Sequence, residues 1–184
     1  MRLRDRLPTY LAEQGLPEHG GQEGHIDWIT AFGLRWPVPN PPIRKAILPK
    51  HDAHHLITGY ETDAIGEAEV GAWALGATGP QPLLGLVYDQ LAIGLGMLQA
   101  PVRTTRAFYA GRGCQTVYDI AVPTLLDTDL ADLRAHTRID TPRLRHWTDH
   151  VAFAKTLALA VVMPMLAPLL MLVVVLQRPS RQTA

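Results

Sequence analysis

The sequence contains a single cysteine, Cys114, so no disulfide can form within the chain and a cysteine-based zinc finger is excluded. It also lacks an excess of charge of either sign, because 17 basic residues balance 17 acidic ones. Without a basic excess or a local basic stripe, nothing in the sequence favours nucleic acid as a partner. Aromatic residues make up 7% of the chain, and the apolar residues are mainly Ala, Leu and Val, which favours helices over strands.

The beginning of the chain lacks an apolar segment of signal-peptide length, and we therefore expect that the protein is not secreted. No internal repeat is visible, and no alternation of apolar and polar residues extends beyond four positions. At 184 residues the chain is long enough to bury the core of one domain. We predict an all-α fold, with a single helical domain over residues 1–150 and an apolar C-terminal segment over residues 151–184.

Caps, glycines and prolines predict the helix boundaries. A first helix is expected around Leu3, Leu7 and Leu11, and residues 26–32 are expected to form a helical turn or two. Four prolines between residues 36 and 42 exclude a regular helix and predict a rigid connector. Further helices are predicted over 43–58, 63–75, 82–99, 101–111 and 130–136. The first of these is expected to break near Pro49, and a connector is expected at 118–126. A last helix is predicted to start at Thr141–Pro142 and to continue into the tail.

The C-terminal segment contains no charged residue from Thr156 to Leu176. A helix of that length spans about 31 Å, close to the hydrocarbon thickness of a bilayer. Pro164 and Pro168 would each cost about 3 kcal/mol inside a soluble helix, whereas neighbouring groups in a membrane can satisfy the freed carbonyls. We therefore expect a C-terminal membrane anchor, with a kinked, partly inserted hairpin and a buried core helix as the alternatives.

One short stretch carries a pattern typical of metal binding, in which His51, Asp52 and His55 are followed by Glu67. His51 and His55 are four residues apart and therefore lie on one face of a helix. Asp52 lies at the edge of that face, and Glu67 falls at the start of the next predicted helix. Two imidazoles and two carboxylates from adjacent helices suit Zn²⁺, Fe²⁺ or Mn²⁺ and suit Ca²⁺ poorly. The alternative explanation is an exposed, charged helix–turn–helix, which would contain the same residues without binding a metal.

Two other metal-binding patterns share part of this spacing. His51, Asp52 and His55 have the spacing of the zincin motif, in which the intervening acid is the general base, but Asp is one methylene shorter than Glu. The stretch also resembles one histidine box of membrane fatty-acid desaturases, with residues 146–150 as a second box. Those enzymes need several membrane spans, and this chain offers one convincing span.

The stretch also resembles the Coq4 family of ubiquinone (coenzyme Q) biosynthesis. The hallmark of that family is His-Asp-x-x-His, eleven residues and Glu, which here is His51, Asp52, His55 and Glu67 without a gap. The resemblance covers residues 43–139. It extends to the Leu-Ile-Thr-Gly-Tyr segment at 56–60, to Gly66, and to the arginine-containing helix at 130–134.

This resemblance implies an all-helical protein that is associated with membranes on their cytoplasmic or matrix side. It would bind a polyprenylated quinone precursor or a related lipid and work with other quinone-biosynthesis enzymes, with a homodimer as one expected assembly. A divalent metal would be held by His51, Asp52, His55 and Glu67, which are also the expected catalytic residues. We expect Zn²⁺ first, with Fe²⁺ or Mn²⁺ as alternatives.

The implied activity is that of a metal-dependent lyase that removes the C1 carboxylate of a polyprenylated benzoate head group, with hydroxylation at C1. Arg103 and Arg106 are expected to anchor the substrate carboxylate, although a solvated helix edge is the simpler explanation of both. The apolar helix at 82–99 could hold the prenyl chain, although plain core is the simpler explanation there. The alternative function is a non-catalytic lipid-binding scaffold that organises other enzymes and uses the metal structurally.

Overall fold

The computed structural model describes residues 1–16, 24–31 and 34–176. Within these ranges the chain forms helices and one pair of strands. In chain order they are α1 (Leu3–Glu13), β1 (Ile26–Ala31), β2 (Leu34–Pro39), α2 (Pro42–Thr58), α3 (Ala64–Gly76), α4 (Leu83–Gln99), α5 (Pro101–Gly111), α6 (Val122–Asp127), α7 (Leu130–Thr137) and α8 (Trp147–Leu176). The predicted helical class is confirmed, and the short hairpin of β1 and β2 is an addition to it.

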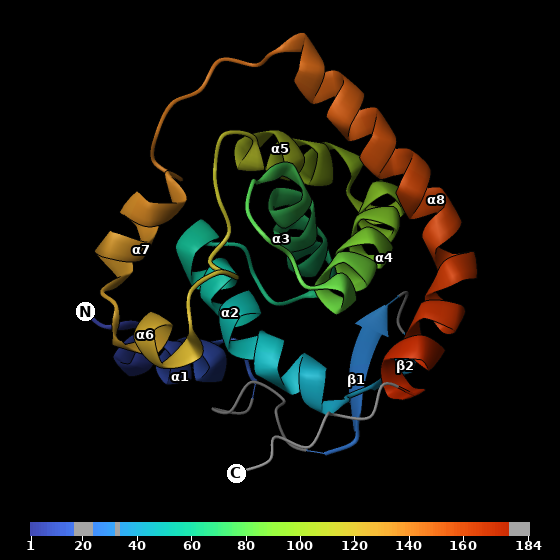
Figure 1. The fold of residues 1–184 in the computed structure, drawn as a ribbon, viewed down its shortest axis with the longest axis horizontal. Helices are drawn as coiled ribbons and strands as arrows, with labels where there is room; N and C mark the ends of the chain where they lie inside the picture. The colour runs from blue at the N-terminus through green and yellow to red at the C-terminus, as the bar shows by residue number, and fades with distance from the viewer. Residues whose placement is uncertain (17–23, 32–33, 177–184) are drawn as a thin grey trace.

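Helix α3 lies at the centre of the molecule, with α2, α4 and α5 around it and α8 on the outer side of α4 (Figure 1). It can occupy this place because most of its residues are small or apolar, and most are buried. Ala72 of α3 packs with Ile93 of α4 and Phe108 of α5 in one apolar cluster. A second cluster joins α1, α2, α6 and α7 through Leu11, Ile57, Leu125 and Leu133.

The turn between α2 and α3 has a defined cap on each side. Helix α2 ends at Gly59, whose φ of 77° is the left-handed conformation that favours glycine at this position. Helix α3 begins after Asp63, whose carboxylate accepts hydrogen bonds from the N–H groups of Ile65 and Gly66. Both boundaries agree with the sequence prediction, and together they hold the end of α2 close to the start of α3.

Helix α2 runs through Pro49, so the predicted break near this residue is wrong. A proline inside a helix removes one hydrogen bond and costs about 3 kcal/mol. Burial of Ala53 and Ile57 of the same helix in the second apolar cluster offsets this cost. Because the helix is continuous, Ile43, Ile47, His51 and His55 follow one another at four-residue intervals on a single ridge of its surface.

The helical turn predicted at 26–32 and the connector predicted at 36–42 are wrong where the structure describes these residues, and 32–33 lie outside them. Strands β1 and β2 pair antiparallel, with Trp28 opposite Pro37 and Ile26 opposite Pro39. A two-stranded sheet tolerates proline because each strand has a free edge toward which the missing N–H can face.

The predicted start of the last helix at Thr141–Pro142 is also wrong, because α8 begins at Trp147. The carboxylate of Asp149 accepts hydrogen bonds from the backbone N–H of His146 and from the side chains of Arg112 and Arg143, so the segment before α8 folds back onto the start of the helix. Residues 118–126, predicted as a connector, include most of α6.

Helix α8 packs against α4 along one side and exposes apolar side chains on the other. Met163 and Ala167 pack against Val87 of α4, whereas Met165 is 82% exposed. In the described part of the chain, α8 is the one helix long and apolar enough to cross a membrane, over Trp147–Leu170, and 22% of its most apolar window is buried. The predicted boundary between the helical domain (residues 1–150) and the apolar C-terminal segment (residues 151–184) falls inside this helix.

Candidate metal centre

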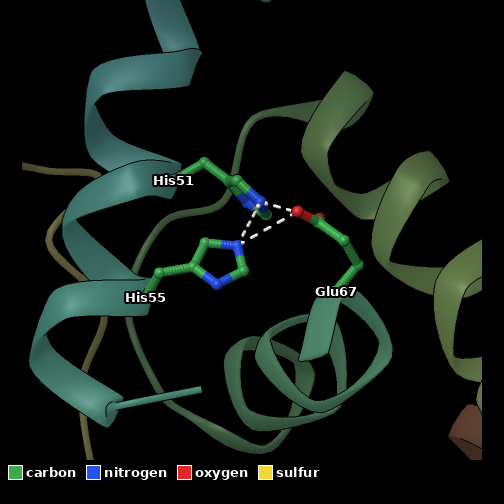
Figure 2. Close-up of side chains that lie close together, drawn as sticks. All are labelled: His51, His55 and Glu67. Carbon is green, nitrogen blue, oxygen red and sulfur yellow. Dashed lines mark hydrogen bonds and ion pairs between the residues drawn. The ribbon is translucent and has the colours of Figure 1, made fainter. Parts of the chain in front are cut away.

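Helices α2 and α3 bring three ligand groups together where the two helices meet (Figure 2). His51 and His55 project from α2, and Glu67 projects from the first turn of α3. Nε2 of His51 lies 3.1 Å from Oε2 of Glu67, and Nε2 of His55 lies 3.2 Å from Oε1 of Glu67. The two Nε2 atoms are 3.2 Å apart. These three residues form a group that could hold a metal ion.

The separations between the ligand atoms fit a small divalent cation. Bonds of about 2.0–2.1 Å in a tetrahedral site place neighbouring ligand atoms about 3.3 Å apart. The three observed separations are 3.1, 3.2 and 3.2 Å. Two imidazole nitrogens and a carboxylate form a ligand set that suits Zn²⁺, Fe²⁺ or Mn²⁺. The donor chemistry and the spacing therefore agree with the metal site predicted from the sequence.

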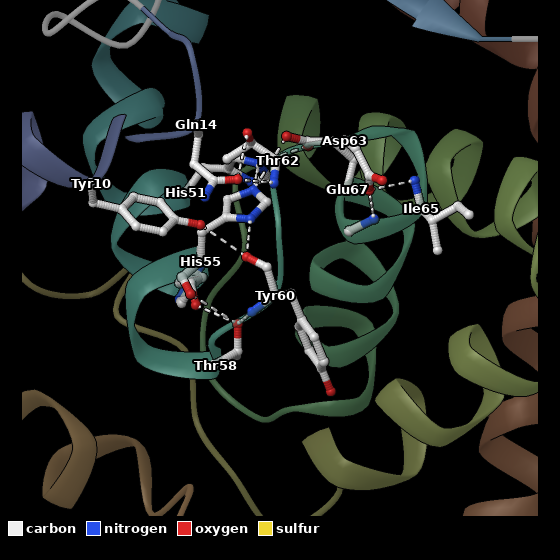
Figure 3. A network of polar contacts seen from close by, with 12 residues as sticks. Tyr10, Gln14, His51, His55, Thr58, Tyr60, Thr62, Asp63, Ile65 and Glu67 are labelled. Carbon is white, nitrogen blue, oxygen red and sulfur yellow. Dashed lines mark hydrogen bonds and ion pairs between the residues drawn. The ribbon is translucent and has the colours of Figure 1, made fainter. Parts of the chain in front are cut away.

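The ring of His55 is oriented by the backbone carbonyl oxygen of Tyr60 (Figure 3). Nδ1 of His55 lies 3.1 Å from this oxygen, which also accepts a hydrogen bond from the hydroxyl of Tyr10 at 2.9 Å. A carbonyl oxygen can only accept, so Nδ1 carries a hydrogen, and Nε2, on the side of Glu67, is the ring nitrogen that could bind a metal. This is the arrangement that metal-binding histidines usually show.

The charges of His51 and Glu67 shift the pKa of each other. Burial lowers the pKa of His51, but attraction to the Glu67 carboxylate outweighs burial and raises the pKa to about 9. Burial raises the pKa of Glu67, but His55 and His51 outweigh that effect and hold the pKa far below its ordinary value. The side chain of Glu67 is 43% exposed and that of His55 is 1% exposed, so the group is open on the side of Glu67.

The fourth predicted ligand, Asp52, is not among the three residues whose ligand atoms converge. Its side chain is buried, and burial raises the pKa of Asp52 to about 6 although the charges of His51 and His55 oppose the increase. The charge of Arg44 also lowers its pKa, so Asp52 has a cationic neighbour of its own. A role for Asp52 as a ligand stays a prediction.

The histidine arrangement of a desaturase does not form. His54 points away from the group, and its Nε2 accepts a hydrogen bond from the N–H of Val117 at 3.0 Å. Its ring packs against Trp73 and Tyr118, and burial holds the pKa of His54 well below its ordinary value. His150 lies elsewhere, with its Nδ1 2.7 Å from the hydroxyl of Tyr109. His54 is therefore part of the core.

The two predicted substrate arginines do not form a pair at the metal group. Arg103 makes a two-pronged contact with the carboxylate of Glu69, at 2.9 and 2.6 Å. Arg106 lines a separate open cavity of about 340 Å³ together with Arg145 and Val102, and none of the three metal-binding candidates lines it. A role for either arginine in binding the substrate stays a prediction.

One buried acid of α4 was not predicted as part of the site. Asp89 is the only charged residue of α4, and it is 3% exposed. Burial raises the pKa of Asp89 to about 7, while the charge of His51 lowers this pKa and that of Glu67 raises it. A Cβ atom at Gly71 of α3, one turn after Glu67, would lie 3.1 Å from the Cα atom of Asp89, so Asp89 lies near the metal group. A lone acid within an apolar helix was the signal that could have identified it.

A cavity of about 370 Å³ lies beside the first half of α2 and is lined by Ile43, Ile47, Lys50 and Tyr118 among others. Ile43 and Ile47 precede His51 on the same ridge of α2, and none of the three metal-binding candidates lines this cavity. The side chains of α4 that were expected to hold a prenyl chain include Leu84, Val87 and Ile93, which are buried in the core.

Comparison of the chain with protein-family models, with curated proteins and with solved structures found no match.

Proposed function

We propose that the protein is a metal-dependent enzyme of quinone biosynthesis, acting on a polyprenylated aromatic acid. The observation that carries this proposal is the convergence of His51, His55 and Glu67 on one point. Their spacing in the sequence is that of the Coq4 family, and their spacing in space is that of a divalent-metal site. The proposal includes Asp52 as a further ligand, because its buried carboxyl group follows His51 directly in α2.

The residues fit Zn²⁺ best, and Fe²⁺ or Mn²⁺ next. When bound, the metal would supply Lewis-acid chemistry at the phenolate or carboxylate of the head group. His51 and His55 would hold it through their Nε2 atoms, and the Tyr60 carbonyl would keep the His55 ring in place. Glu67, the most exposed member, faces the side from which a substrate would enter.

The cavity beside α2 would receive the apolar part of the substrate. Ile43 and Ile47 contribute an apolar wall on the ridge that leads to His51. Lys50 also lines the cavity and directly precedes His51 in α2, and its cation could bind an acidic head group. Its ammonium group is oriented by a hydrogen bond of 2.7 Å to the carbonyl oxygen of Tyr118. We assign to Lys50 the anchoring role that was expected of Arg103 and Arg106.

In the proposed reaction, the bond between C1 of the ring and its carboxylate breaks and CO₂ leaves. A C1–oxygen bond forms with one atom of O₂ and becomes the C1 hydroxyl, and the other oxygen atom leaves as water. From carboxylate to phenol the balance requires two electrons, which we assign to an external two-electron reductant, and three protons, which come from that reductant and the solvent. The chain would orient the head group and keep bulk water away from C1.

We further propose that α8 attaches the protein to the membrane that contains its substrate. Its outer face presents apolar side chains such as Val161, Met165 and Leu169 to the surroundings. A side that packs on α4 and an opposite side of exposed apolar residues suit a helix that meets lipid on one side. The partners of the protein would then be the lipid substrate and other enzymes at the same membrane.

The test uses the full chain in detergent, loaded in turn with Zn²⁺, Fe²⁺ and Mn²⁺. A prenylated hydroxybenzoate labelled with ¹³C in its carboxylate is added with O₂ and a two-electron reductant. We expect labelled CO₂ and a C1-hydroxylated product, both lost in His51→Ala and Glu67→Ala. Metal and lipid binding without turnover under all three metals would instead support the non-catalytic scaffold.

A further inference from the structure

Asp89 is a buried acid without a cationic partner of its own. Its Oδ2 atom is buried and makes no hydrogen bond within the part of the chain that the structure describes. No ion pair joins Asp89 to a lysine or arginine there, and the charged groups that act on it are His51 and Glu67. A buried carboxylate is costly unless a cation or hydrogen-bond donors compensate it. The burial of Asp89 therefore requires a positive charge or a hydrogen-bond donor that compensates its carboxylate.

The packing of α3 against α4 places Asp89 next to the metal-binding side of α3. A Cβ atom at Gly71 would lie 3.1 Å from the Cα atom of Asp89, so α4 approaches α3 closely only because residue 71 has no side chain. Gly71 lies four residues after Glu67 and therefore on the same face of α3. Asp89 thus faces α3 one helical turn from Glu67.

One turn earlier on the same face of α4, the groups that approach the helix are Pro82 and Tyr118, and neither carries a positive charge. Gly85 precedes Asp89 by one turn of α4, and the hydroxyl of Tyr118 lies 3.8 Å from the position of a Cβ atom at Gly85. Burial raises the pKa of Tyr118 well above its ordinary value, and the negative charge of Asp89 raises it further. The groups near Asp89 are therefore the Tyr118 phenol, Gly85, the Glu67 carboxylate and the His51 imidazole.

A divalent cation between His51, His55 and Glu67 would change this balance. Two neutral imidazoles and one carboxylate leave such a centre with one net positive charge, in a partly buried place. The charges of Asp52, the further ligand proposed above, and of Asp89 would both reduce this positive charge. Among the described residues, Arg44 also acts on Asp52, whereas no cationic group other than His51 acts on Asp89.

We propose that Asp89 is an outer anion of the metal centre, contributed by α4, and that its charge strengthens divalent-metal binding by His51, His55 and Glu67. The inference rests on the proposed metal centre and adds to it a third helix and a residue outside the motif of α2 and α3. Asp89 is not among the atoms that converge on the metal position, so it acts as a positioning residue beside the ligands.

The test is a titration of the metal-free full chain in detergent with Co²⁺, monitored by its visible absorption, followed by competition with Zn²⁺. In Asp89→Asn, which keeps the shape and removes the charge, we expect metal affinity to fall by about 10–100-fold. Gln90→Met is the matched control, because Gln90 is equally buried on α4 and its Oε1 atom is also without a hydrogen-bond partner in the described residues. The control should bind metal like wild type.

Metal-free stability separates this role from a purely structural one. Loss of an uncompensated buried charge should leave metal-free Asp89→Asn at least as stable as wild type, with a smaller gain in Tm on adding metal. Asp89→Leu provides a second variant with the same expectation. Unchanged metal affinity in both Asp89 variants, with metal binding by wild type intact, would overturn the inference and leave the proposed function standing. A wild-type protein that binds no metal would overturn both.

Discussion

Nδ1 of His55 lies 3.1 Å from the backbone carbonyl oxygen of Tyr60, five residues later in the chain. This one contact connects the turn after α2 to the chemistry of the metal group, because it decides which ring nitrogen of His55 can bind a metal. The same carbonyl oxygen is held by the hydroxyl of Tyr10 from α1. The N-terminal helix therefore supports the site without contributing a ligand.

Replacement of Tyr10 by Phe removes the hydroxyl that fixes the Tyr60 carbonyl. We expect a loss of about 1 kcal/mol in the free energy of unfolding and a decrease of up to about tenfold in metal affinity. Urea unfolding and Co²⁺ titration measure the two effects. Tyr88→Phe is the control, because its hydroxyl donates to the carbonyl of Pro39 away from the metal group. Equal effects of both variants on metal affinity would contradict the role of Tyr10.

Replacement of Asp63 by Ala removes the cap that starts α3 one turn before Glu67. Its carboxylate accepts hydrogen bonds at 3.1 and 2.7 Å from the first N–H groups of the helix. We expect a loss of about 1 kcal/mol in stability and weaker metal binding, because fraying of the first turn displaces Glu67. Asp63→Ser keeps a capping oxygen and should retain most of the stability and most of the metal affinity of wild type. Chemical denaturation with and without Zn²⁺ measures the difference.

Replacement of Asp149 by Asn should destabilise the fold and leave the metal centre intact. Its buried carboxylate contacts both Arg112 and Arg143 at 2.9 Å. Removing one charge from a buried ion-pair network costs about 3 kcal/mol, which guanidinium unfolding would detect. Asp140→Asn breaks an exposed pair with Arg134, which solvent screens, and should destabilise the fold much less. A similar loss in the free energy of unfolding for the two variants would show that the Asp149 network adds little to the stability of the fold.

Acidic substitutions on the outer face of α8 should weaken membrane binding without unfolding the protein. Val161 and Met165 are among its most exposed apolar side chains. We expect Val161→Glu combined with Met165→Glu to reduce co-flotation of the full chain with phospholipid vesicles by about tenfold or more. Ile26→Glu, on the exposed side of β1, is the control and should float like wild type.

Local chemical signals predicted the helices that build the site. The caps at Gly59 and Asp63 could be recognised in the sequence because each acts through its own residue type. The four-residue interval between His51 and His55 sets their common face in any helix. These three features were sufficient to predict that two imidazoles and Glu67 meet.

The features that were missed depend on contacts between distant residues. The hairpin of β1 and β2 carries prolines that argue against a strand until its partner and free edges are known. The start of α8 is decided by Asp149, whose arginine partners include Arg112 from the end of α5. Asp89 belongs near the metal group only because α4 packs over Gly71, which no spacing within the sequence reveals.

The central claim is that His51, His55 and Glu67 hold a divalent metal, and metal analysis tests it most directly. The full chain is purified in detergent as wild type and as Glu67→Ala, and each is analysed by inductively coupled plasma mass spectrometry after exposure to Zn²⁺, Fe²⁺ and Mn²⁺. We predict about one bound metal ion per chain in wild type and a large loss in the variant, with helix content preserved by circular dichroism. No metal in wild type, or the same metal content in both proteins, would contradict the account.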